Sequence, residues 1–233
     1  MSSSPTPHRT AAHRTVSRRS LFGGALAVGT GLLLTACSSG GSSSGSAPNA
    51  AAGSVDTQQQ SVYKGTDLGR TFAKPDITLT DTSGKPFNLV TGTAGKAMLL
   101  YFGYTRCPDV CPTTMGDLAV AVSKLTPAQQ QQVDVVFIST DPAVDTPSVI
   151  GTWLRSFNPR FIGLTGDINT VIKAAASVGV FVAAAKAGQE PVHGAEVLGF
   201  FPSDNAAHVL YTSGTVWQDY AHDMPLLIKS VPV

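Results

Sequence analysis

The sequence has few charges and few cysteines, and each shortage excludes a class of protein. Charged residues make up 13% of the 233 and hydrophobic residues 42%, so the chain is too apolar to be disordered throughout. After the first forty residues there is no apolar run of about 18 residues, which excludes a polytopic membrane protein. Three cysteines are too few for a disulfide scaffold, and their odd number requires one to be explained separately.

Charge is distributed unevenly along the chain. The whole sequence has 16 basic and 15 acidic side chains, a formal net charge of +1. Four arginines and no acidic residue lie within residues 1–36, so the remainder has 12 basic against 15 acidic side chains, a net charge of −3. A mildly acidic body argues against a nucleic-acid partner held by a basic surface.

Residues 1–36 have the profile of an export signal. A polar region containing arginines leads into an apolar segment, residues 21–36, which four glycines interrupt. A helix of that length spans about 24 Å, short of the ~30 Å hydrocarbon core, so a removable signal is favoured over a permanent membrane span. The segment Ser17–Phe22 resembles a twin-arginine signal; an ordinary basic leader is the alternative interpretation.

Cys37 ends this apolar segment and accounts for the odd cysteine. Leu34-Thr35-Ala36 before it resembles a bacterial lipoprotein signal, in which the cysteine is acylated; an incidental cysteine is the alternative. Acyl chains would hold the protein on a membrane without a spanning helix. Residues 37–61, which follow as a Ser-, Gly- and Ala-rich stretch, are expected to be a flexible tether. The sequence thus predicts an exported domain, residues 62–233, anchored to the outer face of the bacterial cell membrane.

The exported part alternates strand and helix patterns. Continuous apolar runs predict central strands at residues 97–102 and 133–139, with shorter strands at 77–80, 87–89 and 161–164. Apolar spacing and capping residues predict helices over 112–125, from Pro147 through Phe157, and from Asp167 onward.

The last third has a different pattern. Strands at 195–201 and 207–212 are separated by turn residues and predict a hairpin. A final helix over 215–229 follows, which Pro225 should interrupt. These elements predict a thioredoxin-like α/β fold: a central mixed sheet flanked by helices, with a C-terminal β-hairpin and helix.

Cys107 and Cys111 lie where a buried strand gives way to a helix. Unpaired N–H groups at a helix N-terminus favour an anion, so both thiols are expected to be more acidic than a free cysteine. If the first turn is helical, the three-residue gap puts both sulfurs on one helix face, close enough to chelate one metal or form a disulfide. Two thiolates and an imidazole suit Cu(I), and zinc less specifically. A stabilising disulfide and two inert buried thiols are the alternatives.

Three histidines after the tether are candidates for a third ligand. His193 lies in a polar loop before the hairpin, where ligands are often mounted, and is favoured. His208 lies within the second hairpin strand and is the runner-up. His222 lies in the final helix and is interpreted as a surface residue.

Three ordered segments resemble the Sco/SenC family of copper-binding, thioredoxin-fold, membrane-attached proteins. They are residues 101–112, which carry the cysteine pair, residues 139–147 and residues 161–166. The resemblance covers about residues 70–230 and implies copper, as Cu(I) or Cu(II), bound by Cys107, Cys111 and a distal histidine. His193 matches that histidine by its place before the hairpin, with Val192 where the family commonly has an aspartate.

Two aspartates are candidates for supporting roles near the cysteines. Asp141 ends a central strand and should lie at the same sheet edge, where it could hold the site or simply form a turn before Pro142. Asp109 lies between the cysteines and could tune the loop; an acid at a helix start is the simpler interpretation.

Two functions fit one site. The resemblance implies a chaperone that delivers copper to the dinuclear copper centre of cytochrome c oxidase. The alternative is an enzyme, a thiol–disulfide oxidoreductase that cycles Cys107 and Cys111 to reduce cysteines of the oxidase subunit or of a partner copper chaperone. Only delivery needs the histidine, so delivery is favoured and the chain is interpreted as a binding protein rather than an enzyme.

Overall fold

A mixed sheet of eight strands has the two most apolar runs of the sequence near its centre. The structure is a computed structural model, and it describes residues 61–186 and 188–233; the predicted signal, Cys37 and nearly all of the tether lie outside these residues. The strands are β1 (Thr66–Ala73), β2 (Thr78–Asp81), β3 (Pro86–Asn88), β4 (Ala97–Gly103), β5 (Val133–Ser139), β6 (Ile162–Thr165), β9 (Val197–Phe200) and β10 (Ala206–Tyr211).

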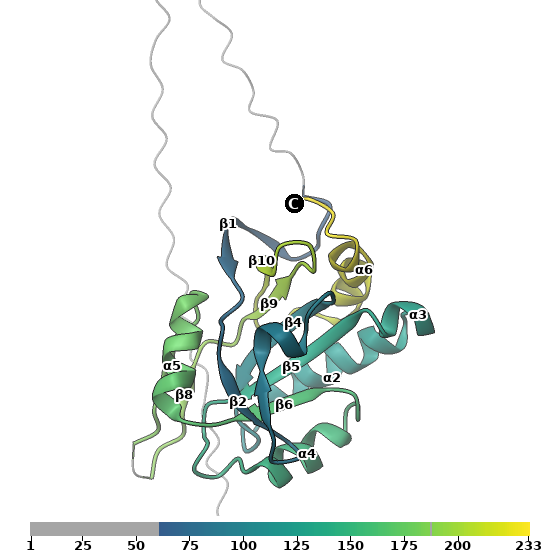
Figure 1. Cartoon of the computed structure of the whole chain (residues 1–233). Helices are drawn as coiled ribbons and strands as arrows, with labels where there is room; N and C mark the ends of the chain where they lie inside the picture. Colours follow the sequence, from purple (N-terminus) through teal and green to yellow (C-terminus); the bar gives the residue numbers. More distant parts are fainter. Residues whose placement is uncertain (1–60, 187) are drawn as a thin grey trace, which may run out of the picture. The chain divides into compact units, whose positions relative to one another are not determined.

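The strands lie in the order β1-β10-β9-β4-β5-β6-β2-β3 across the sheet (Figure 1). Strands β4, β5 and β6 run parallel, while β9 pairs with β4 in the antiparallel sense. Every residue of β4 and β5 is buried, as their unbroken apolar character predicted. The parallel strands therefore end together at one edge of the sheet, and the cysteine loop follows β4 there.

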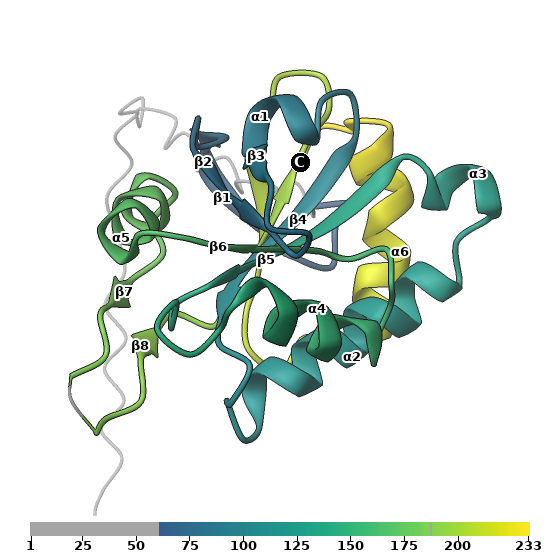
Figure 2. The same cartoon turned by 60° about the horizontal axis from the view of Figure 1, so that its bottom comes forward.

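Helices cover both faces of this sheet. They are α1 (Leu89–Gly92), α2 (Val110–Ser123), α3 (Pro127–Gln130), α4 (Pro147–Arg155), α5 (Ile168–Ser177) and α6 (Trp217–Ile228). Alternate residues of β4 point to opposite faces. Leu99 and Tyr101 belong to a core shared with α2, α4 and α6, whereas Leu100 and Phe102 belong to a core shared with α1 and α5. Figure 2 shows α5 well apart from α2 and α6, across the sheet.

Helix starts follow from local sequence. The Thr146 side chain accepts a hydrogen bond from the N–H of Val149, and Pro147 occupies the first turn. Asp167 accepts from the N–H of Thr170 in the same way. Both helix starts were predicted correctly, and a strand–helix–strand half followed by the hairpin and α6 gives the predicted thioredoxin-like arrangement.

Several features depart from the predictions, among them the short helices α1 and α3, which were not predicted. Helix α6 continues through Pro225 instead of breaking there; Tyr220, Met224 and Leu227 on either side of it are buried in the core, which holds both turns in place. The strand β1 was not predicted, because its side chains are mostly exposed and lack an apolar alternation. In the short ribbon, β7 (Val182–Ala183) was not predicted and β8 (Val192–His193) was predicted as part of a loop.

None of the helices in the described part of the chain is both long and apolar enough to cross a membrane.

Candidate metal centre

The two cysteines occupy unlike positions at the end of β4. Cys107 lies in the loop and is partly exposed, whereas Cys111 lies in the first turn of α2 and is fully buried. Both are free thiols, and the Cys111 N–H donates to the Cys107 Sγ at 3.4 Å. The pair therefore presents one sulfur to the surface and one to the core.

This difference corrects one expectation, that both thiols are acidic. Burial raises the pKa of Cys107, but N–H donors of Cys111 and Asp109 outweigh it and leave that pKa below its usual value. Burial raises the pKa of Cys111 to about 12, well above that of a free cysteine. The helix N-terminus therefore lowers the pKa of Cys107 only, because Cys111 is buried and has lost its contact with water.

Tyr101 lies beneath the pair as part of β4. Its hydroxyl donates to the Cys111 Sγ at 3.4 Å, and the side chain has no exposed surface. Burial, followed by the nearby Cys111 sulfur, keeps the pKa of Tyr101 far above its usual value. The phenol is thus a proton donor toward the buried sulfur throughout the ordinary pH range.

His193 reaches the cysteines from the β7–β8 ribbon. Its Nε2 lies 3.8 Å from the Cys111 Sγ, and its Nδ1 lies 2.8 Å from the carbonyl oxygen of Gly194. A carbonyl oxygen only accepts, so Nδ1 carries a proton, and in the neutral imidazole the Nε2 lone pair faces the sulfur. The ring planes of Tyr101 and Tyr104 each lie at 83° to the plane of the imidazole, and these edge-to-face contacts further fix its orientation.

These three donors suit a soft metal ion. Sulfur and nitrogen ligands of one ion, at about 2.3 and 2.0 Å from it, are separated by roughly 3.5–3.7 Å, close to the 3.8 Å between Cys111 and His193. Within residues 61–186 and 188–233, no three His, Cys, Asp or Glu side chains already stand at metal-site spacing.

The other two histidines lie elsewhere. His208 on β10 places Nε2 2.8 Å from Asp204 Oδ2 and stacks on Phe201 with 3.9 Å between ring centres. His222 on α6 contacts the carboxylate of Asp223. The structure thus brings His193, and neither alternative, to the cysteines; its role as a ligand remains a prediction.

The predicted supporting aspartates differ in what they touch. Asp141 is buried and accepts a hydrogen bond at 3.0 Å from Arg106, the residue before Cys107. Asp109 stands at the N-cap of α2, but its side chain makes no capping hydrogen bond there. Asp141 is therefore placed to hold the cysteine loop, whereas Asp109 contributes through its backbone N–H.

Asp145 was missed as a residue of this site. The sequence placed it at the start of α4, but Thr146 is the cap and the Asp145 side chain turns inward to Thr105 and Ser139. One signal in the sequence could have identified it: Asp145 closely follows the end of a predicted buried strand, residues 133–139, and so lies at the sheet edge that also carries the cysteine loop.

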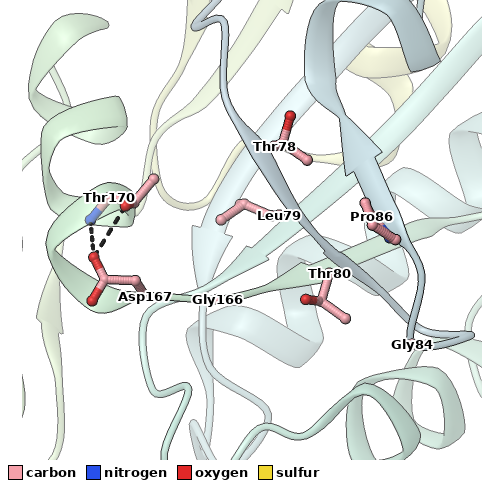
Figure 3. A pocket seen from close by; sticks show the side chains of 8 residues that line it. All are labelled: Thr78, Leu79, Thr80, Gly84, Pro86, Gly166, Asp167 and Thr170. Atoms are coloured by element: carbon pink, nitrogen blue, oxygen red, sulfur yellow. Dashed lines mark hydrogen bonds between the residues drawn. The ribbon is translucent and has the colours of Figure 1, made fainter.

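Two surface pockets lie outside the donor set. One of about 350 Å³ lies between β2 and the start of α5, where the Asp167 carboxylate is turned to Thr170 (Figure 3). Its lining contains no cysteine or histidine. The other, about 430 Å³, is lined by Thr105 and four residues of α4: Ser148, Val149, Thr152 and Trp153. It adjoins the cysteine loop without containing a donor for a soft metal.

Comparisons with known proteins agree with the resemblance. A family model described as SCO1/SenC matches residues 66–214. Protein SCO2, mitochondrial, of Saccharomyces cerevisiae is 43% identical over 93 residues, 40% of this chain and 31% of that protein. An SCO2-like protein of Rickettsia felis is 42% identical over 94 residues, 40% of this chain and 44% of that protein. The chain thus spans less than half the length of these two relatives.

Solved structures show the same fold. Copper-bound ScoI of Bradyrhizobium japonicum is 28% identical with a TM-score of 0.58, over 66% of this chain and 98% of that one. Apo Sco1 of Thermus thermophilus is 32% identical with a TM-score of 0.59, over 72% of this chain and 96% of that one. The thioredoxin-like fold is therefore confirmed.

Proposed function

The chain belongs to the SCO1/SenC family, and from that premise we propose that Cys107, Cys111 and His193 bind copper for delivery to the dinuclear copper centre of cytochrome c oxidase. The observation that carries the proposal is the approach of His193 Nε2 to 3.8 Å from the Cys111 sulfur, with Nδ1 tied to a carbonyl. Copper is the cargo here, so the site must both hold it and release it.

The donor set meets both demands. Two sulfurs and one imidazole match the preference of Cu(I) for soft ligands. Three protein ligands leave a position through which a ligand of the receiving protein can enter before the copper leaves. The raised pKa of Cys111 means that copper must displace its proton, so copper affinity should increase as pH rises through the neutral range.

The test is a copper titration of the purified chain, with His193→Ala as the variant and His208→Ala as its matched control. We expect His193→Ala to weaken copper binding by at least about tenfold and His208→Ala to leave it unchanged. A sulfur-to-Cu(II) charge-transfer band in the unsubstituted protein would report thiolate ligation. Unchanged affinity in His193→Ala would remove His193 from the ligand set.

A second function has its own supporting observation, the inequality of the two thiols. Cys107 is partly exposed with a lowered pKa, which suits an attacking thiolate, and the buried Cys111 suits the resolving thiol. A thiol–disulfide oxidoreductase acting on the oxidase subunit or on another copper chaperone would need no histidine. Thiol exchange that survives His193→Ala while copper binding is lost would separate the two functions.

Attachment to the outer face of the cell membrane completes the proposal. Cys37 lies outside the described residues, and its sequence context supports a lipoprotein. Cys37→Ser should release the protein from the membrane fraction while leaving copper binding intact. A variant that still partitions fully with membranes would exclude a lipid on Cys37.

A further inference from the structure

Asp145 is a fully buried carboxylate beside the cysteine loop. It accepts three hydrogen bonds: Thr105 Oγ1 donates to Oδ1 at 2.5 Å, and the Thr105 N–H and Ser139 Oγ donate to Oδ2 at 3.0 and 2.7 Å. Removing a carboxylate from water is costly unless its oxygens are well paired. Two of the three donors belong to Thr105 in the cysteine loop, so these hydrogen bonds fix the position of Thr105.

The carboxylate is itself held at a fixed place. Ser139 is the last residue of β5, and its hydroxyl oxygen also accepts from the N–H of Asp141 at 3.0 Å. The N–H of Asp145 donates to the carbonyl oxygen of Asp141 at 2.8 Å, which closes the turn after β5. Asp145 thus ties the end of one central strand to the loop that leaves its neighbour β4.

Thr105 stands two residues before Cys107, so its position governs that of the exposed sulfur. We propose that Asp145 is a positioning residue for the thiol pair: through Thr105 it keeps Cys107 over the start of α2, where it meets Cys111. The copper-binding consequence rests on the proposed function, whereas the effect on the two thiols does not. Asp141 holds the next residue, Arg106, but through an exposed side chain that water screens.

The chain contains a matched control for this aspartate. Asp223 on α6 is also fully buried, and it accepts the backbone N–H groups of Lys64 at 2.9 Å and Gly65 at 2.8 Å. It therefore ties a distant segment to the core in the same way as Asp145, but its hydrogen-bond partners, Lys64, Gly65 and His222, include neither thiol nor any residue of their loop. Asp223→Ala should weaken the fold without changing the thiol pair.

The experiment compares Asp145→Ala, Thr105→Val and Asp223→Ala with the unsubstituted full-length protein. The first readout, without copper, is the equilibrium in which oxidised glutathione takes two electrons from the thiol pair, giving the Cys107–Cys111 disulfide and two reduced glutathione molecules. The second is Cu(I) affinity, and urea unfolding reports stability. We expect Asp145→Ala to disfavour the disulfide by at least fivefold and to weaken Cu(I) binding by about 10–100-fold.

Thr105→Val replaces the hydroxyl with a methyl group and keeps the rest of the side chain, so it decides the question if Asp145→Ala does not fold. We expect it to shift the exchange equilibrium by at least twofold in the same direction. Asp223→Ala should leave both site readouts within twofold. Site readouts unchanged in Thr105→Val and in any folded Asp145→Ala would overturn the proposal, as would an equal shift in Asp223→Ala. Absence of copper binding by the unsubstituted protein would refute copper delivery, while the exchange equilibrium still tests Asp145.

Discussion

The two sides of the candidate metal centre are built very differently. The cysteines follow β4, in which every residue is buried and which lies between two other strands of the sheet. His193 comes from a two-strand ribbon, β7–β8, paired over two residues of each strand. Phe181 and Val192 in and beside the ribbon are 64% and 59% exposed. One side of the centre is thus part of the hydrophobic core and the other is attached at its surface.

This contrast shows how one site can both hold and release a metal ion. The Cys111 sulfur cannot move far without disturbing the core that surrounds it. The imidazole is held by the Gly194 carbonyl and by contacts with the rings of Tyr101 and Tyr104. We therefore expect the histidine side to yield first when a receiving protein supplies its own ligand.

The sharpest test of the contrast is local opening. Amides in strands buried on both faces exchange only when the domain unfolds, whereas a short surface ribbon opens by itself. We expect amide hydrogens of β4 and β5 to exchange at least about 1000-fold more slowly than those of β7 and β8, given a typical domain stability of at least about 5 kcal/mol. Exchange measured by NMR or mass spectrometry gives the ratio. Equal protection would show that the ribbon belongs to the same cooperative unit as the core.

Truncated side chains should show the same contrast in stability. Leu100 on β4 is fully buried, so Leu100→Ala should lower the free energy of unfolding by about 2–5 kcal/mol, typically a hundredfold or more in the folding equilibrium. Val192→Ala, at an exposed position, should change it by less than about 0.5 kcal/mol. Urea unfolding measures both. A large loss in Val192→Ala would mean that the ribbon supports the core.

The thiol side also contains a contrast of its own. At neutral pH we expect iodoacetamide to modify Cys107 at least about 30-fold faster than Cys111, because Cys107 is more exposed and more of it is thiolate. The Cys107 rate should increase with pH and level off above its pKa, which lies below its usual value because the effect of burial is outweighed by the N–H groups that donate to the sulfur. The Cys111 rate should still be increasing at pH 10. Mass spectrometry of the separate peptides measures each site, and comparable rates would contradict the burial argument.

How far the sequence predicts this molecule follows the same division. The strand–helix junction that carries the cysteine pair was predicted correctly, because a continuous apolar run and the helical spacing after it lie next to each other in the sequence. His193 was located only by its order before the hairpin, since its ribbon pairs residues with no strand pattern. The prediction that Cys111 is acidic was wrong, and Asp145 was missed as a site residue, for the same reason. Both properties depend on burial created by segments distant in the chain, which local sequence does not specify.

The smallest expected effect tests whether the Tyr101 hydroxyl influences the buried thiol of Cys111. Tyr101→Phe keeps the ring and removes the hydroxyl that donates to the Cys111 sulfur at 3.4 Å. Hydrogen bonds to sulfur are weak, so we expect a stability loss of at most about 1 kcal/mol. Because the phenol lowers the pKa of Cys111 against the larger effect of burial, its removal should raise that pKa further.

In a Cys107→Ser background, Cys111 alkylation at pH 10 should therefore become slower, with Tyr104→Phe as the matched control. A faster reaction would mean that the hydroxyl shields the sulfur more than it stabilises the thiolate, and that exposure rather than charge sets the inequality between the two cysteines.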